Sequence, residues 1–347
     1  FLDYHLYDYI ITDSAWHEAR TSQGYYDVNP AKLVIQFGDK PYVDVRNSLN
    51  SFTTVDISKE LREKLVSFYL DKLESNPELQ DKIEFEIAFT CFDLNFDKKS
   101  KELIVAGFSP GEVTELKQSL INLTNNLVLN AKEDIDNDIN ILKIMEKIRE
   151  ETKKEINWET DSINSLLTKA KFLLDDCREN GTVQFSRLAR LAFIGKIILK
   201  SLVKRGVIDD KIYSGFMNSV NTVASEIMYD YKKMCTKEIG KHDFIKKYYH
   251  LRPGTYDITS LRYDSNPNLF KEMNINSTIE ERTEFVIENE TLNKIGTYLS
   301  QEGLKFNSKE LLEFAKKAIE AREKAKFEFS KNLSDAIELI IFIGEKM

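Results

Sequence analysis

The fold is decided by the stretch FAKKAIEAREKAKFEFSKNLSDAIELI, residues 314–340. Apolar side chains such as Phe327 and Leu333 alternate in it with charged ones, which is the pattern of an amphipathic helix. Arg322 and Lys326 are four residues apart, so they share one face of that helix. The pattern predicts a helix that packs inward and directs two cations toward an anion. The alternative is a surface helix in which the aliphatic parts of the Lys and Arg side chains only cover apolar neighbours.

Long helices are also predicted between about residues 110 and 249. Acidic and basic residues alternate on one side of these segments, and Leu, Ile and Phe recur on the other. We expect short breaks near Asp134, 157–160, 180–181 and 206–209. Two further helices are expected over about 278–302 and 307–345, the second of them capped by Ser308.

The first hundred residues have a mixed pattern. We expect a helix over 3–23, a hairpin in KLVIQFGDKPYVDVR (32–46), a helix over about 58–75 capped by Ser58, and a strand or buried helix in KIEFEIAFTCF (82–92). The predicted fold class is therefore mainly α, with a small α+β N-terminal part and a helical substrate-binding domain. Residues 1–109 form the mixed region, and residues 110–347 form the helical region, which includes the loop at 250–264.

Composition excludes several classes of protein. Of the 347 residues, 42% are apolar and 31% are charged, which is typical of a globular chain. A net charge of −8 argues against a nucleic-acid binder. No apolar run is long enough for a membrane span, and there is no signal-peptide pattern. The widely spaced Cys91, Cys177 and Cys235 predict neither a zinc site nor disulfides, so we expect a cytoplasmic protein without a bound metal.

The helical pattern is interrupted by YYHLRPGTYDITSLRYD, residues 248–264. Pro253–Gly254 is a turn signal, and a residue before proline, here Arg252, is disfavoured in the helical region. A stiff loop that exposes polar side chains is a common place for binding groups. The loop therefore offers His250, Arg252, Tyr256, Asp257 and Arg262 as candidate site residues.

Two N-terminal segments also combine cations with carboxylates or amides. YDYIITDSAWHEAR (7–20) contains Arg20, and KPYVDVRNSLNSF (40–52) contains Asp44, Arg46 and Asn50. We expect Asp44 and Arg46 to lie on one face of a strand. Structural ion pairs and helix caps are the alternative explanation for both clusters.

Motifs for ATP chemistry are absent. The sequence contains no glycine-rich phosphate loop, no dinucleotide fingerprint, no H-E-x-x-H and no nucleophile elbow. Its four histidines do not share ligand spacing. If the protein takes part in catalysis, we expect the groups that use ATP to lie outside this chain, which begins with Phe1 and resembles a piece of a longer protein.

The four segments at 7–20, 40–52, 250–264 and 318–340 occur in an order that resembles phosphoenolpyruvate-synthase-like phosphotransferases, with LRPGTYDI (251–258) the most specific element. The resemblance spans nearly the whole chain. It implies a plan similar to that of pyruvate phosphate dikinase, in which an ATP-grasp part uses ATP and Mg²⁺ and a swivelling domain carries a phosphohistidine. Neither part is recognisable here, so the resemblance implies the central, acceptor-binding piece of the same polypeptide, with no cofactor of its own.

Within that family the chain resembles L-glutamine kinases of bacterial capsule phosphoramidate synthesis, which phosphorylate the side-chain amide. An amino acid acceptor needs a cation for its carboxylate, and a bidentate arginine suits that role. The resemblance thus implies acceptor-binding roles for Arg252, Tyr256, Asp257, Arg262, Asp44, Arg46, Asn50 and Arg20. It implies phosphate binding by Arg322 and Lys326, and His250 as a catalytic base. The alternatives are a related enzyme with another acceptor, such as pyruvate or an antibiotic hydroxyl, and a helical scaffold without a small-molecule site.

Overall fold

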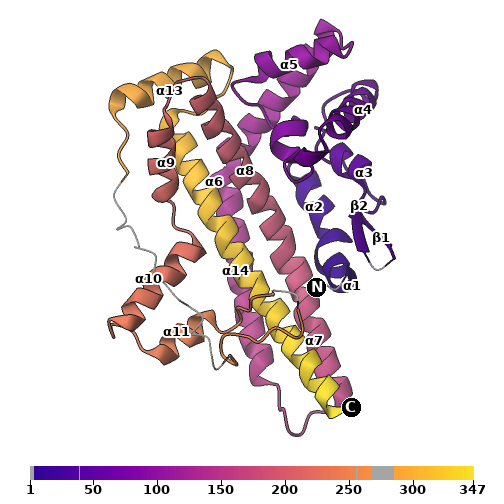
Figure 1. The fold of residues 1–347 in the computed structure, drawn as a ribbon, viewed down its shortest axis with the longest axis vertical. Coiled ribbons are helices and arrows are strands. Elements are labelled where there is room, and N and C mark those ends of the chain that lie inside the picture. The colour runs from indigo at the N-terminus through magenta and orange to yellow at the C-terminus, as the bar shows by residue number, and fades with distance from the viewer. Residues whose placement is uncertain (1–3, 39, 255–256, 267–284) are drawn as a thin grey trace.

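The computed structural model describes residues 4–38, 40–254, 257–266 and 285–347 (Figure 1). Within these ranges the protein is mainly helical, with one two-stranded antiparallel sheet near the N-terminus. The prediction of a mainly α fold with a small α+β N-terminal part is therefore confirmed. One continuous cluster of buried side chains extends from Ile10 to Ile337, so the N-terminal region shares its core with the long helices.

The N-terminal elements are short and are arranged along one side of the helical bundle (Figure 1). In chain order they are α1 (Tyr4–Tyr7), η1 (Asp8–Thr12), α2 (Ala15–Ser22), β1 (Val34–Phe37), β2 (Lys40–Val43), α3 (Val45–Asn50), α4 (Lys59–Ser75), η2 (Pro77–Leu79), η3 (Ile83–Ile87) and α5 (Phe96–Val105).

The remaining elements include the longest helices of the protein. They are α6 (Pro110–Lys154), α7 (Ile163–Cys177), η4 (Arg178–Thr182), α8 (Val183–Lys204), α9 (Asp210–Asn218), α10 (Val223–Cys235), α11 (Lys241–Tyr248), α13 (Asn289–Gln301) and α14 (Ser308–Lys346). The helices α7 and α8 are joined through the π-helical turn η4, so residues 163–204 form one long helical run. This run, α6 and α14 lie side by side as a three-helix bundle (Figure 1).

The central helix of the bundle is α14, which contacts α6, α7 and α8. Small residues allow it to approach its neighbours closely. A Cβ added at Gly195 of α8 would lie 3.0 Å from the Cα of Ala315, and a Cβ added at Gly181 of η4 would lie 2.7 Å from the Cβ of Phe329. Both glycines therefore lie where helices cross with little room between the backbones.

Several expected elements are confirmed. The strands β1 and β2 pair from Val34 with Val43 to Phe37 with Lys40, as the hairpin pattern predicts. The helix α4 begins after Ser58, whose hydroxyl accepts a hydrogen bond from the Leu61 amide at 3.4 Å. A hydroxyl at this position satisfies an amide that has no partner within the helix.

Other expectations are wrong. Of the two interpretations of residues 82–92, the strand is wrong and the helix is closer: residues 83–87 form a π-helical turn, and among the described residues no strand lies beside them to supply ladder hydrogen bonds. Asp134 lies inside α6, and residues 180–181 lie in η4, so neither position ends a helix. The cap of α14 is Asn307, in a reciprocal pair with Glu310, not Ser308. At Asp134 and at 180–181 a local breaker signal is overridden by packing between long helices, whereas the cap of α14 is decided by the local Asn307–Glu310 pair.

The close crossing at Gly181 gives a prediction for stability. Gly181→Ala should lower the free energy of unfolding by about 1–3 kcal/mol, because the new methyl group meets Phe329 and the Met145 sulfur 3.1 Å away. The matched control is Gly296→Ala in α13, where no atom lies within 4 Å of the added Cβ. That change should be neutral or stabilising by up to about 1 kcal/mol. Urea denaturation measures both; equal effects would contradict the crossing argument.

Candidate functional site

The loop after α11 folds against the side of α14 (Figure 1). The helix α11 ends at Tyr248, and the chain returns on itself so that the Tyr263 amide donates to the Leu251 carbonyl at 2.8 Å. The helix thus ends close to the position that the Pro253–Gly254 turn predicts. Tyr256 lies outside the described residues.

Arg252 fastens this loop to α14. Its Nη2 donates to the Ser334 hydroxyl at 3.1 Å and to Glu338 Oε1 at 2.7 Å. Its Nη1 donates to the carbonyl oxygens of Asp257 at 3.4 Å and Ser260 at 3.2 Å. All of its terminal nitrogens are therefore used inside the protein, and only the buried Nε–H has no partner. This arrangement differs from the free carboxylate clamp that the sequence suggests.

His250 is a buried polar side chain of the loop whose ring makes no hydrogen bond. It is 2% exposed, its ring lies edge-on to Phe327 with centroids 4.6 Å apart, and neither ring nitrogen has a hydrogen-bond partner. Burial lowers its pKa to about 2, and the charges of Lys331 and Arg149 add to that effect. The imidazole is therefore neutral at physiological pH. A buried polar group without a hydrogen-bond partner costs about 1–3 kcal/mol of stability. Such groups are uncommon in folded proteins, so this one calls for an explanation.

A cavity of about 260 Å³ adjoins His250. The loop contributes His250, Leu251 and Arg252, and α10 contributes apolar side chains between Val223 and Ile227. The wall on α14 is a stripe at helical spacing, formed by Glu323, Lys326, Phe327, Ser330 and Ser334. The cavity therefore combines an apolar wall with a few polar groups, as small-molecule sites do.

The two predicted phosphate-binding residues differ in their surroundings. Lys326 lines the cavity and makes no hydrogen bond or ion pair with any residue in the described ranges. Arg322 does not line it, and its Nη1 is paired with Glu323 Oε1 at 2.8 Å. Its guanidinium also lies 5.4 Å from the ring centroid of Phe193 on α8. Only Lys326 is therefore free to meet a ligand in this cavity.

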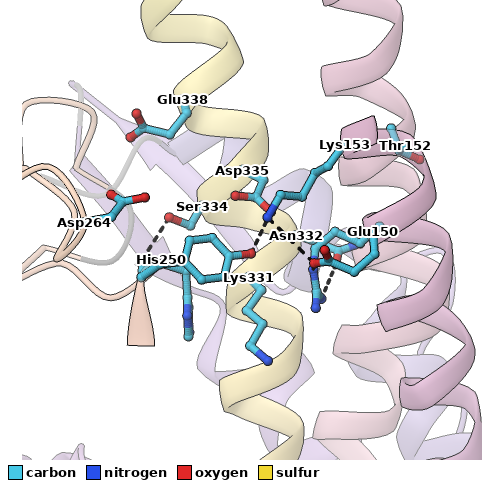
Figure 2. A network of polar contacts seen from close by, with 12 residues as sticks. Glu150, Thr152, Lys153, His250, Asp264, Lys331, Asn332, Ser334, Asp335 and Glu338 are labelled. Carbon is cyan, nitrogen blue, oxygen red and sulfur yellow. Dashed lines mark hydrogen bonds and ion pairs between the residues drawn. The ribbon is translucent and has the colours of Figure 1, made fainter. Parts of the chain in front are cut away.

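A network of polar contacts joins the loop, α14 and α6 (Figure 2). Asp335 of α14 accepts hydrogen bonds from the Tyr249 hydroxyl and from Arg262, both at 2.9 Å, and faces Lys153 of α6 at 3.6 Å. Arg262 is also paired with Asp264. These contacts hold the loop against both α14 and α6. Arg262 is thus committed to protein partners, like Arg252.

Deeper in the bundle, Asn332 links three helices. Its side chain accepts from Arg149 of α6 at 3.0 Å and donates to Asp176 of α7 at 2.8 Å. Beside it, Lys331 is paired with Glu328 at 2.9 Å. These contacts fix the positions of the cations that surround His250.

The N-terminal candidates lie apart from this cavity, on the other side of the bundle (Figure 1). Asp44 is the N-cap of α3, where its carboxylate accepts from the Asn47 amide at 3.0 Å, and Arg46 lies exposed in that helix. The expectation that both lie on one face of a strand is wrong. Asn50 donates to the Arg46 carbonyl at 3.1 Å. Asp44 and Asn50 are explained by local helix structure, and Arg46 is an exposed surface residue.

Arg20 and Asp257 also have structural partners. Arg20 bonds to the Ser51 hydroxyl and lies 4.0 Å from the ring centroid of Phe52. Burial lowers its pKa to about 10, with a further contribution from Arg190. Asp257 accepts from the amide and the hydroxyl of Thr259, at 2.9 and 2.7 Å, which stabilises the turn. Neither side chain lines the cavity.

The sequence analysis missed Glu323, Ser330 and Ser334. A signal for them was present, because they share a face of α14 with Lys326 at the three- and four-residue spacing of a helix. The apolar wall from α10 had no such signal, since nothing in the sequence shows that α10 lies opposite α14.

Comparison with known proteins adds no assignment: no family model, no curated protein and no solved structure matches the chain significantly. Among the described residues, no group of three or more His, Cys, Asp or Glu side chains is arranged to hold a metal ion. In the same part of the chain, no helix has both the length and the apolar character needed to cross a membrane.

The contacts of Arg252 predict a large effect on stability. Arg252→Ala should lower the free energy of unfolding by about 3 kcal/mol, because it removes one partner of a largely buried ion pair. Arg252→Lys should recover part of this loss, since an ammonium cannot make all four hydrogen bonds. Arg46→Ala, at an exposed position in α3, is the control and should change stability by about 0.5 kcal/mol at most. Chemical denaturation at pH 7 measures the free energy of unfolding of all three variants. Equal losses in the two alanine variants would show that Arg252 does not hold the loop against α14.

The burial of His250 predicts a pH dependence. Its pKa of about 2 in the folded protein lies below the ordinary value of 6.5, so the unfolded chain binds more protons between these two pH values. The stabilisation is complete above pH 6.5 and declines as the pH falls. From pH 7 to pH 5 the loss should be about 2 kcal/mol.

Urea denaturation at both pH values checks this expectation. His250→Gln should remove most of this loss, whereas His242→Gln, at an exposed position in α11, should retain it. The same pH dependence in His250→Gln and in the unchanged protein would show that His250 is not the responsible group.

Proposed function

We propose that this chain is the acceptor-binding part of an ATP-dependent phosphotransferase that works through a phosphohistidine, with L-glutamine as the acceptor. The observation that carries the proposal is the cavity beside the loop after α11. There the buried neutral imidazole of His250 and the ammonium group of Lys326 both lack protein partners. In this proposal ATP, Mg²⁺ and the phosphohistidine belong to other parts of the same polypeptide, and the protein works in the cytoplasm.

The size of the cavity supports a small acceptor. Drug-sized ligands occupy sites of roughly 300–1,000 Å³. A volume of about 260 Å³ is smaller than that range and suits a single amino acid. The rival acceptor with an antibiotic hydroxyl requires more space. Pyruvate fits by volume, so binding experiments must distinguish it from glutamine.

The state of His250 suits phosphorylation of an amide nitrogen. A neutral imidazole has one nitrogen that accepts a proton and one that donates a hydrogen bond. In this proposal the accepting nitrogen takes the proton that the amide loses as its bond to phosphorus forms. The low pKa limits His250 as a base in the free protein, so this role requires that bound ligand charge raise it.

A helical scaffold without a ligand is the second candidate function. The long bundle and its charged surface suit a scaffold. However, a scaffold gives no reason to bury an imidazole at a cavity without a partner, at the cost described above. That observation favours a binding site.

Calorimetric titration of the chain with L-glutamine, L-glutamate, L-asparagine and pyruvate tests the proposal. Glutamine should bind saturably and more tightly than the other three. His250→Gln should weaken glutamine binding about tenfold, the effect of one lost hydrogen bond at a buried site. The control His242→Gln should bind as the unchanged protein does. If no small acceptor binds, the scaffold is the better description.

A further inference from the structure

Exposed apolar side chains gather around a second hollow, at the C-terminal end of α14. This hollow, of about 300 Å³, lies between the end of α14, the connection from α6 to α7 and the loop after α11. The end of α14 lies beside that connection (Figure 1). All three segments contribute to the apolar lining, which consists of Trp158, Ile258, Leu261, Ile341 and Phe342. Segments that are distant in sequence thus bring their apolar side chains to one place on the surface.

Three of these side chains remain open to solvent. Trp158 is 44% exposed, Ile258 is 48% exposed and Leu261 is 56% exposed. The Trp158 ring packs edge-on against Phe342, with centroids 4.9 Å apart, so it is held in place although nearly half of it is exposed. Single exposed apolar residues are ordinary, whereas a contiguous group marks an interaction surface, and tryptophan is enriched in protein interfaces.

The charged side chains in the lining are mainly acidic. They are Arg262, Glu338 and Glu345. Arg262 is committed to two carboxylates of its own, and Glu338 is paired with Arg252, as described above. Glu345 is exposed, and no residue in the described ranges is paired with it. The hollow therefore has an acidic rim on which one carboxylate is left unpaired.

Lys346 shows how a cation binds at this surface. Its ammonium group lies 4.7 Å from the ring centroid of Phe342 and donates to the Trp158 carbonyl at 3.0 Å. Lys346 is thus used within the protein. Glu159, which follows Trp158, is exposed like Glu345, and neither has an ion-pair partner in the part of the chain that the structure describes. Two carboxylates beside the apolar surface therefore remain for cations from another molecule.

We propose that this hollow docks a basic segment of a partner protein, a segment that also carries apolar side chains. Its apolar side chains fill the hollow between Trp158 and Leu261, and its lysines or arginines pair with Glu345 and Glu159. Burial of the exposed apolar surface supplies the affinity, and the acidic rim selects basic segments over acidic ones. The inference is independent of the proposed function, because the two cavities share no lining residue.

The acidic rim decides between a protein segment and two other occupants. A membrane surface carries anionic lipids, which exposed carboxylates repel. A second copy of this chain, in a two-fold symmetric dimer, would place the same acidic rim opposite itself. A basic segment with apolar side chains is the occupant that matches both the lining and the rim.

Two model peptides of equal length test the proposal: an amphipathic peptide of leucine and lysine, and its leucine–glutamate counterpart. Fluorescence anisotropy of the labelled peptides measures their affinity for the chain. The leucine–lysine peptide should bind saturably, and the leucine–glutamate peptide should bind at least about tenfold more weakly. Added salt should weaken the first interaction, since the carboxylates of the rim are exposed to screening.

Substitutions distinguish docking in the hollow from binding elsewhere. Leu261→Ser should weaken binding of the leucine–lysine peptide about tenfold, because it removes apolar surface that the peptide covers. Glu345→Gln should weaken it roughly two- to fivefold, the effect of one exposed ion pair. The matched controls lie at exposed positions outside the lining: Val105→Ser at the end of α5 and Glu74→Gln in α4. Both controls should bind as the unchanged protein does.

The fluorescence of Trp158 reports where the peptide binds. The chain has two tryptophans, and the other one, Trp16, is buried. Binding in the hollow should shift the emission to shorter wavelength and protect it from quenching by acrylamide. Both changes should be absent in Trp158→Phe.

Each outcome decides for or against the proposal. It is supported if the leucine–lysine peptide covers Trp158 and loses affinity in Leu261→Ser and Glu345→Gln but not in the two controls. Equal binding of both peptides, equal affinities of Leu261→Ser and Val105→Ser, or no binding at all would overturn it. A shift of Trp158 emission with vesicles of anionic lipid, or with rising protein concentration alone, would assign the hollow to a membrane or to a second copy instead.

Discussion

The middle of α14 is buried on every side although most of its side chains are polar, and the rest of the structure depends on this constraint. Every residue from Glu328 to Ile337 is buried. Polar groups removed from water need partners, or they cost more free energy than the apolar contacts around them contribute. Arg149 of α6 and Asp176 of α7 supply partners on one side through Asn332. The bundle is therefore fixed in register by polar contacts as well as by its apolar core.

The loop after α11 completes this arrangement on the other side of α14. Asp335 receives hydrogen bonds from Tyr249 and Arg262, and Ser334 and Glu338 receive them from Arg252. The loop leaves its apolar side chains Ile258 and Leu261 exposed instead of packing them into the core, so these charge-assisted bonds contribute much of what holds it in place. The same bonds that partner the buried polar groups of α14 thus position His250 against the helix.

The cavity lies where this network of partners ends. Two residues before the buried polar segment, α14 presents the exposed Lys326, and the loop presents His250 with both ring nitrogens unpartnered. Elsewhere in the site each charge lies beside an opposite one. Of these two groups the buried imidazole is the one that the fold leaves unsatisfied, because the exposed lysine is solvated by water.

The sequence by itself determined the helical class, the hairpin, the cap at Ser58, and the turn that ends α11, because each depends on residues within a few positions of one another. It also identified the loop and the Arg322–Lys326 face. Only the tertiary structure decided which charges are free. Arg252, Arg262 and Arg20 have partners 31 to 86 positions away, and no local pattern reveals such pairs. For the same reason the sequence grouped N-terminal side chains with the loop although the folded bundle separates them.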